Sequence, residues 1–319
     1  MSLDEFGMIN RYLKPLAKGF PGALALTDDA ALIDCCSNEQ IVIAKDALVE
    51  NVHFLSSDPV DLIARKLLRT NLSDMAAMGA KPFGYLTMIA WPPTLQADFF
   101  PTFAKGLAAD QREFAVHLLG GDTVSTSGPL VLSLTILGSV PKGHALTRSA
   151  AKIGDLVFVS GTLGDAALGL RVLRGLAATE DEALALVDRY RLPRPRIALG
   201  QALLGVAGAA IDVSDGLLAD LGHIASTSAV GIDIDIVNLP LSEAARSLPG
   251  ALEAALSGGD DYELAFTVPP GKIEEALMAA KRAGVPITQI GRVTERRGVR
   301  ALDRQGQQLE LAQTGWVHF

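Results

Sequence analysis

The stretch that decides the fold is Ala209–Asp220, AAIDVSDGLLAD, in the C-terminal half of the chain. Its short apolar run predicts a strand, Gly216 predicts a turn, and the apolar-periodic residues that follow predict a helix. The turn carries Asp212, Ser214 and Asp215, whose oxygen atoms suit a hydrated Mg²⁺ ion. Asp and Ser are also common helix caps, so the stretch alone is compatible with either role.

Acidic turns of the same kind recur along the chain, which favours the metal-binding interpretation. They follow predicted strands or helices and comprise Asp28-Asp29, Asp46, Asp74, Asp122 and Asp260-Asp261. Carboxylates that converge on one cleft repel one another and need cations to neutralise them. If these carboxylates converge, Mg²⁺ is the expected partner and phosphate the expected second partner, because hard cations bridge carboxylates to phosphate oxygens.

Strands and helices are predicted in both halves of the chain without a regular alternation, so the fold class is α+β. The length of 319 residues favours two domains, and the Pro, Gly and charged residues of Pro141–Gly154 predict the boundary. Predicted elements include strands at Ile41–Asp46 and Leu156–Ser160, a helix at Phe99–Phe114, and a terminal hairpin around Gly298.

The composition is that of a globular protein, with 49% hydrophobic and 20% charged residues. The formal net charge of −8 disfavours a nucleic-acid-binding surface, which needs clustered Lys and Arg. Cys35 and Cys36 are adjacent, and neighbouring thiols rarely form a disulfide, which indicates a reducing compartment. No apolar run reaches the roughly 20 residues of a membrane span, and no secretory signal is apparent. We therefore expect a cytoplasmic protein without membrane or nucleic-acid partners.

Glycine pairs are the second recurring feature of the sequence. Gly120-Gly121, Gly161 with Gly164, and Gly258-Gly259 allow close backbone approach. None of them matches the P-loop pattern or the dinucleotide-binding pattern that follows a strand. Any nucleotide site is therefore of another type.

Taken together, these motifs resemble one family, the thiamine-monophosphate kinases of the aminoimidazole-ribonucleotide-synthetase-like (PurM-like) superfamily. The matching segments occur in the family's order and span nearly the whole chain. They are EFGMI (5–9), DDAAL (28–32), KDALVENVHF (45–54), NLSDMAAMGAKP (71–82), LLGGDTV (118–124), LTRSAAKIGD (146–155), VSGTLGDAALGL (159–170), IDVSDGL (211–217), SGGDDYELAF (257–266) and GWVHF (315–319). Each segment alone is weak evidence for the family, but the ordered set of segments is specific to it.

The resemblance implies a two-domain, synthetase-like architecture. Residues 1–143 would form an N-terminal domain that binds ATP and Mg²⁺, and its mixed sheet with helices would pair across a homodimer. Residues 144–319 would form a C-terminal α/β sandwich that completes the nucleotide and substrate site. The implied reaction is direct, in-line transfer of the ATP γ-phosphoryl group to thiamine monophosphate, assisted by several Mg²⁺ ions, in thiamine diphosphate biosynthesis.

The resemblance also implies roles for individual residues. The implied metal ligands are Asp29, Asp46, Asp74, Asp122, Asp212 and Asp215. The implied ATP contacts are Gly121, Asp122, Arg148 and Ser214, and the implied contacts of thiamine monophosphate are His53, Asp260 and Trp316. No covalent nucleophile is implied, because transfer between two phosphates needs positioning and charge neutralisation. From the residues alone, a packing role stays open for His53 and Trp316.

Some positions depart from the family's pattern. Ala44-Lys45 stands where a metal-ligating Thr or Ser is common, so one metal is lost, held by a backbone carbonyl or replaced by the Lys45 ammonium. Asp260 is one methylene shorter than the common Glu, and Ala104 replaces an aromatic residue that contacts adenine.

Two other functions stay open at this point. A same-fold synthetase, such as selenophosphate synthetase or a hydrogenase-maturation dehydratase, typically needs a reactive Cys, and this chain offers only Cys35-Cys36. A non-catalytic sensor of thiamine phosphates or Mg-nucleotide would bind both ligands and release no ADP.

Overall fold

A computed structural model of the chain describes residues 9–20, 37–95, 98–309 and 315. The site residues Asp29 and Trp316 and both cysteines lie outside the described residues.

The chain divides into two compact units. The first comprises Met1–Met75 and Lys81–Gly143, and the second comprises Ala76–Ala80 and His144–Phe319. The last residues of one long helix therefore group with the second unit, although that helix belongs to the first half of the sequence.

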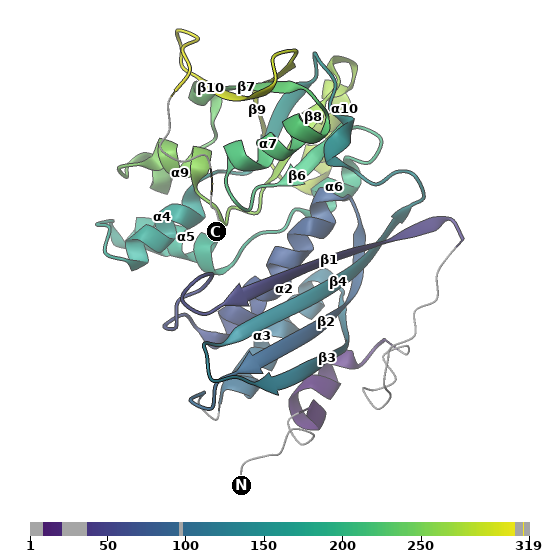
Figure 1. The fold of residues 1–319 in the computed structure, drawn as a ribbon, viewed down its shortest axis with the longest axis vertical. Helices are drawn as coiled ribbons and strands as arrows, with labels where there is room; N and C mark the ends of the chain where they lie inside the picture. The colour runs from purple at the N-terminus through teal and green to yellow at the C-terminus, as the bar shows by residue number, and fades with distance from the viewer. Residues whose placement is uncertain (1–8, 21–36, 96–97, 310–314, 316–319) are drawn as a thin grey trace. The chain divides into compact units, whose positions relative to one another are not determined.

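The first unit contains a four-stranded mixed sheet in the order β1-β4-β2-β3. Its strands are β1 (Glu39–Val49), β2 (Lys81–Trp91), β3 (His117–Ser125) and β4 (Val131–Pro141). β4 pairs antiparallel with β1 and β2, whereas β2 and β3 are parallel. Figure 1 shows α2 (Val60–Ala77) and α3 (Phe99–Phe114) on one face of this sheet, and two short helical turns, Ile9–Leu13 and Lys14–Ala17, precede it in the chain.

Side chains alternate between the two faces of this sheet along each strand, and one of the two faces is buried. Leu132, Leu134 and Ile136 of β4 are fully buried, as are Leu67 and Leu68 of α2. Between the two helices, the Arg69 guanidinium holds the buried Asp110 carboxylate, with Nε 2.8 Å from Oδ2. Since a buried charge is stable only when it is paired, this contact fixes α2 against α3.

The second unit contains a six-stranded sheet in the order β10-β7-β9-β5-β8-β6. Its strands are β5 (Leu156–Ser160), β6 (Ala210–Asp212), β7 (Gly231–Asp235), β8 (Leu264–Val268), β9 (Ile287–Thr294) and β10 (Gly298–Leu302). Its helices are α4 (Asp165–Leu173), α5 (Glu180–Arg191), α6 (Ile197–Ala202), α7 (Leu217–Thr227), α8 (Glu243–Arg246), α9 (Ala251–Ser257) and α10 (Ile273–Ala283), with single 3₁₀ turns at Arg148–Ala150, Ile236–Asn238 and Pro270–Lys272.

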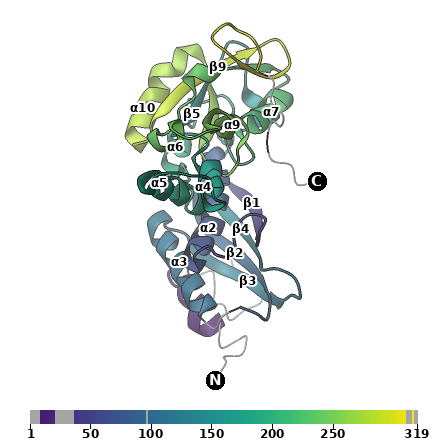
Figure 2. The same cartoon turned by 90° about the vertical axis from the view of Figure 1, so that its left-hand side faces the viewer.

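Helices cover both faces of this second sheet, as Figure 2 shows. Val157 and Val159 of β5 pack into one buried cluster with α7 and α9. Phe158, which points the opposite way, packs into another cluster with α6 and α10. The predicted C-terminal α/β sandwich is thus confirmed, together with the α+β fold class.

The predicted terminal hairpin around Gly298 is wrong. β10 does not pair with β9, its neighbour in sequence, but runs parallel to β7, with Gly298 opposite Gly231. β7 lies between β9 and β10 and occupies the edge of β9 that a hairpin would use. Periodicity identifies such strands, but the pairing partner depends on residues far away in sequence.

Candidate functional site

The acidic turn between β6 and α7 is held by one carboxylate, Asp220. Its Oδ2 accepts hydrogen bonds from the backbone N–H groups of Ser214 at 3.0 Å, Asp215 at 3.1 Å and Gly216 at 3.1 Å. Asp220 is 2% exposed and lies in the first turn of α7. The Asp220 side chain therefore holds the backbone of the turn that carries Asp212 and Asp215.

Negative charge accumulates at this turn. Burial and the neighbouring carboxylates of Asp212 and Asp215 together raise the pKa of Asp220 to about 8, against the lowering by the backbone N–H groups. A cation bound nearby would remove this repulsion. Sequence reasoning missed Asp220 as a site residue, although the stretch quoted first ends with it, because a carboxylate that reaches back to a turn is not visible in spacing.

The Asp260 turn joins the acidic turn directly. The Asp260 N–H donates to the Ser214 carbonyl oxygen at 2.8 Å, and the Tyr262 N–H donates to that of Val213 at 2.7 Å. The Tyr262 hydroxyl donates to Asp260 Oδ1 at 3.1 Å. A Cβ on Gly259 would lie 2.5 Å from the Ser214 oxygen, so only glycine permits this approach.

Two further predicted segments of the second unit lie close to β6 or to the acidic turn that follows it. Thr147 forms a β-bridge with Ala209, which places the exposed Arg148 beside the start of β6. A Cβ on Gly315 would lie 3.0 Å from the Asp215 carbonyl oxygen. Gly315, the first residue of the C-terminal motif, therefore lies at the acidic turn, whereas Trp316 is outside the described residues.

In the first unit, Asp46 is fixed through its backbone from two sides. Its N–H donates to Asn71 Oδ1 of α2 at 3.1 Å, and its carbonyl oxygen accepts from the Ser133 hydroxyl of β4 at 3.0 Å. The Lys45 ammonium donates to that same hydroxyl at 2.7 Å. Asp74, half-buried, lies three residues after Asn71 and therefore on the same side of α2.

His53 lies in a hydrogen-bonded loop after β1. Its Nδ1 accepts from the Val49 N–H at 3.0 Å, so Nδ1 carries a lone pair and Nε2 is the nitrogen that can donate. The buried Lys66 ammonium of α2 donates to the His53 carbonyl oxygen at 3.0 Å. Sequence reasoning identified His53 but not Lys66, which is thirteen residues away.

The sheet register separates two of the predicted ligands in the first unit. Asp46 lies in one row across the sheet with Thr87 and Gly121, and Asp122 lies in the next row, opposite Met88. Successive rows point to opposite faces, so the side chains of Asp46 and Asp122 leave the sheet on different faces. Asp122 is exposed, and its Oδ1 accepts the Thr123 N–H at 2.9 Å.

Within the described residues, no group of three or more His, Cys, Asp or Glu side chains has the arrangement of a metal site. The predicted ligands fall into three sets: Asp29 outside the described residues, Asp46, Asp74 and Asp122 in the first unit, and Asp212 and Asp215 in the second. The same part of the chain contains no helix long and apolar enough to cross a bilayer.

The two units correspond to a known pair of domains. Family models match residues 27–140 (AIR synthase related protein, N-terminal domain) and residues 152–304 (AIR synthase related protein, C-terminal domain). The chain is therefore a two-domain AIR synthase related protein.

Full-length relatives narrow this class. The thiamine-monophosphate kinase of Caulobacter vibrioides is 46% identical over 98% of this chain and 90% of its own length. The crystal structure of thiamine-monophosphate kinase from Stenotrophomonas maltophilia K279a is 41% identical, with a TM-score of 0.86 over 97% of this chain and 99% of that one. AaThiL complexed with AMPPCP and TMP is 32% identical, with a TM-score of 0.78 over 99% and 97%. The chain belongs to the thiamine-monophosphate kinase family.

Proposed function

We propose that this chain transfers the γ-phosphoryl group of ATP to thiamine monophosphate and releases thiamine diphosphate and ADP. The observation that carries this proposal is the end-to-end similarity to thiamine-monophosphate kinases, one of which is known in complex with AMPPCP and TMP. The same similarity, together with the position of Cys35-Cys36 outside every site motif, disfavours a cysteine-dependent synthetase of the same fold.

We assign Mg²⁺ ions to the carboxylates of Asp29, Asp46, Asp74, Asp122, Asp212 and Asp215. The fit rests on the donor set, which consists of hard oxygen atoms, and on the proximity of Asp212 and Asp215 to Asp220, whose pKa is raised by burial and by those two carboxylates. The ions would neutralise phosphate charge as it develops during transfer. The Lys45 ammonium, which leaves β1 on the same face of the sheet as Asp122, would stand in for part of that charge.

The remaining predicted residues would position the two phosphate substrates. Arg148, with its rigid donor fork, and Ser214 would contact ATP, as would Gly121 and Asp122. His53 would donate from Nε2 to the acceptor phosphate, because Val49 occupies Nδ1. Asp260 and Trp316 would complete the binding of thiamine monophosphate. No side chain forms a covalent intermediate in this scheme, and transfer follows from in-line positioning of the two phosphates.

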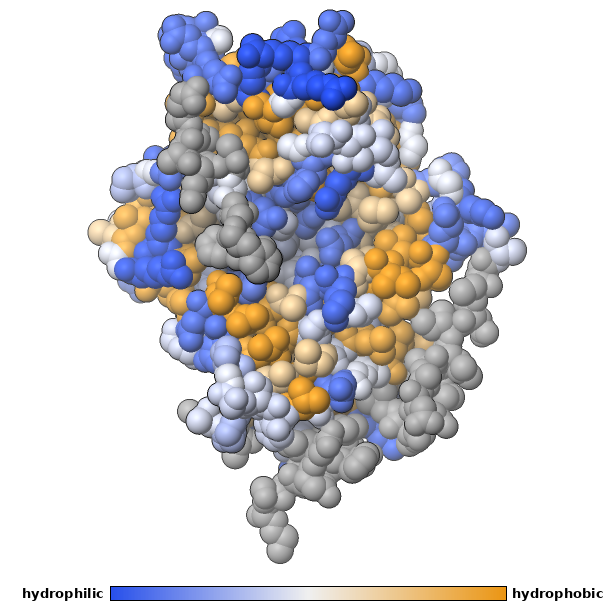
Figure 3. Space-filling view, in the orientation of Figure 1, coloured by the Kyte–Doolittle hydropathy of each residue, from blue (hydrophilic) through white to orange (hydrophobic). Residues whose placement is uncertain are grey.

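We further propose that the protein is a homodimer formed through the first unit. The sheet face opposite α2 and α3 exposes Ile41 (36%), Ile43 (64%), Leu86 (39%) and Val124 (43%). Figure 3 shows hydrophobic patches over this sheet. Exposed apolar patches of this kind are typical of interaction surfaces. Ile43→Glu should convert a dimer into a monomer in light scattering, while Leu184→Glu, an equally exposed position in the second unit, should not.

The domain roles follow from these assignments. Residues 1–143 would supply the first set of Mg²⁺ ligands and the dimer contact, and residues 144–319 would complete the nucleotide and substrate site. We also propose that the reaction takes place in the cytoplasm, which is consistent with the adjacent cysteines in the sequence.

The direct test is to incubate the protein with ATP, Mg²⁺ and thiamine monophosphate and to separate the products by chromatography, with free thiamine as a parallel acceptor. We expect thiamine diphosphate to form in step with ADP, and only from the monophosphate. Tight binding of both ligands without any ADP would instead identify a sensor of these molecules.

A further inference from the structure

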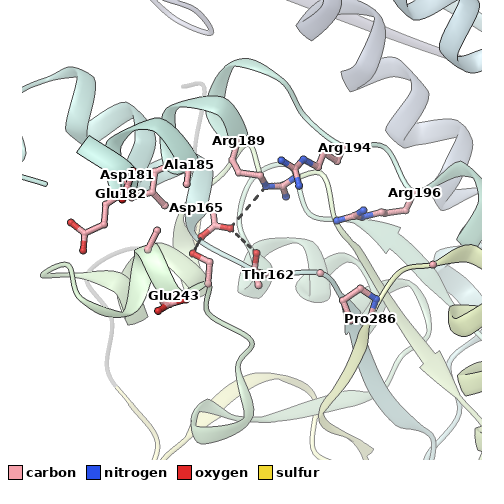
Figure 4. A pocket seen from close by; sticks show the side chains of 15 residues that line it. Thr162, Asp165, Asp181, Glu182, Ala185, Arg189, Arg194, Arg196, Glu243 and Pro286 are labelled. Atoms are coloured by element: carbon pink, nitrogen blue, oxygen red, sulfur yellow. Dashed lines mark hydrogen bonds and ion pairs between the residues drawn. The ribbon is translucent and has the colours of Figure 1, made fainter. Parts of the chain in front are cut away.

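The second unit contains a cavity of about 840 Å³ that none of the predicted site residues lines. It is formed by the turn after β5, the helix α5, the Arg194–Arg196 segment and the start of α8. Figure 4 shows its lining side chains. The volume falls within the range of about 300–1,000 Å³ that is typical of small-molecule sites.

One end of the cavity is built on a buried guanidinium, Arg189, which is 7% exposed. Its Nη2 donates to Glu263 Oε1 at 2.9 Å and to the Asp261 carbonyl oxygen at 3.2 Å. Its Nη1 is buried and makes no hydrogen bond to any residue that the structure describes. Because buried N–H groups are nearly always satisfied, Nη1 is a donor that the folded chain leaves for another molecule.

Two more guanidiniums surround this donor. Arg196 is mostly buried and donates from Nε to Glu263 Oε2 at 2.6 Å. Arg194 is 55% exposed and pairs with the similarly exposed Asp188 at 3.1 Å. Exposed ion pairs contribute little in water, so Arg194 can exchange Asp188 for an incoming anion.

The carboxylates at this end of the cavity already have partners within the chain. Burial raises the pKa of the Asp261 carboxyl well above its usual range, which favours its neutral form. Asp165 is taken up by the hydroxyls of Thr162 and Ser242, each at 2.6 Å. Arg189 and Arg196 share the buried carboxylate of Glu263, and Arg189 also lies 4.0 Å from Asp165. Arg194 has only the exposed Asp188 as its ion-pair partner among the described residues.

The other end of the cavity carries the opposite charge. Asp181 and Glu182 lie in the first turn of α5, and Glu243 lies in the first turn of α8. Hydrogen bonds from the Ser247 hydroxyl and from Thr179 lower the pKa of Glu182, which stays ionised. Figure 4 shows these acids on one side of the cavity and the arginines on the other.

We propose that this cavity binds a small zwitterion, with a phosphate or carboxylate group on Arg189 and Arg194 and an ammonium group toward Asp181 and Glu243. A guanidinium fork matches the geometry of both kinds of anion and holds them by charge-assisted hydrogen bonds. A molecule with a single charge satisfies only one end of the cavity. This proposal does not depend on the phosphoryl-transfer activity.

The test is calorimetric titration of the full chain with phosphoethanolamine, with β-alanine as the carboxylate counterpart and with inorganic phosphate and ethanolamine as half-ligands. We expect phosphoethanolamine or β-alanine to bind at least about tenfold more tightly than either half-ligand. The zwitterion that binds more tightly shows whether the cavity prefers a phosphate or a carboxylate group. Saturating thiamine monophosphate should not compete with it.

Variants at exposed positions assign the binding to this cavity without disturbing the buried network. Arg194→Gln should weaken zwitterion binding about tenfold, whereas Arg304→Gln, in an exposed turn outside the cavity, should not. Glu243→Gln should weaken binding of the zwitterion but not binding of inorganic phosphate. Unchanged affinity in both cavity variants, equal affinity for zwitterion and phosphate, or no saturable binding would each overturn the proposal.

Discussion

The ammonium of Lys66 lies 3.0 Å from the carbonyl oxygen of His53 and donates a hydrogen bond to it. Lys66 is 2% exposed, which is unusual for a lysine. The contact joins α2 to the loop that follows β1. The Val49 N–H also donates to the imidazole Nδ1 of His53 at 3.0 Å. His53 is thus fixed at both its backbone and its ring, as a residue that positions a phosphate should be.

Lys66→Met should therefore raise the KM for thiamine monophosphate by tenfold or more and change kcat less, because it frees the His53 backbone while keeping a similar buried volume. The loss of the charged hydrogen bond should also destabilise the fold by about 1–3 kcal/mol. Lys105→Met, at an exposed position of α3, is the matched control. A KM equal to that of the unmodified protein would rule out a positioning role for Lys66.

Asp74→Asn and Asp212→Asn should each abolish most of the activity and leave the fold intact. Each replaces a proposed Mg²⁺ ligand by a neutral side chain of the same size, one in each unit. Turnover across a Mg²⁺ titration, together with circular dichroism, measures both effects, with the exposed Asp98→Asn as control. Near-normal turnover in either variant would refute the assignment of that residue.

Asp220→Ala should destabilise the protein by about 1–3 kcal/mol and impair catalysis, because the N–H groups of Ser214, Asp215 and Gly216 lose their acceptor. Asp220→Asn keeps an acceptor oxygen and should retain most of the stability. Chemical denaturation and turnover distinguish the two variants. If both lose the same stability, the three backbone hydrogen bonds do not hold the turn.

Lys45→Thr should steepen the dependence of activity on Mg²⁺ concentration. The Lys45 ammonium bonds to Ser133, which in turn bonds to the Asp46 backbone, so removing it withdraws a positive charge that one more metal ion would have to supply. Lys142→Thr, at an exposed position, provides the control. Superimposable Mg²⁺ titration curves would show that Lys45 does not stand in for a metal.

Asp261→Asn should make the stability of the protein less dependent on pH. Burial raises the pKa of Asp261, so its contribution to stability is fully present below the unfolded pKa, about 4, and is lost as the pH rises toward the folded value. Asn keeps an acceptor for the Gly164 N–H, which lies 2.8 Å from Asp261 Oδ2, and cannot ionise.

The free energy of unfolding of Asp261→Asn should therefore increase relative to that of the unmodified protein as the pH rises above about 4. The exposed Glu274→Gln should show no such trend. A difference between Asp261→Asn and the unmodified protein that stays constant with pH would mean that this carboxyl is ionised in the folded state.

Local patterns in the sequence were sufficient for much of this fold. Phe99–Phe114 and Leu156–Ser160 have the predicted bounds, because helix periodicity and β-branched runs are short-range signals. The acidic turn was likewise readable, since strand, turn and helix start are contiguous.

Long-range relationships were not readable from one sequence. The pairing of β10 with β7, the return of Asp220 to its turn and the contact between Lys66 and His53 depend on which surfaces meet after folding. The opposite faces of Asp46 and Asp122 depend on a register that no single strand encodes. The network of Arg189, Arg196 and Glu263 joins residues 67 to 74 positions apart.

The measurement that tests the central claim most directly is the fate of ATP labelled in its γ-phosphoryl group, with Mg²⁺ and thiamine monophosphate. Direct transfer predicts that the label appears in the terminal phosphate of thiamine diphosphate, one equivalent for each ADP, and that no label stays on the protein. Label released as inorganic phosphate without thiamine diphosphate, or AMP as the nucleotide product, would contradict the account.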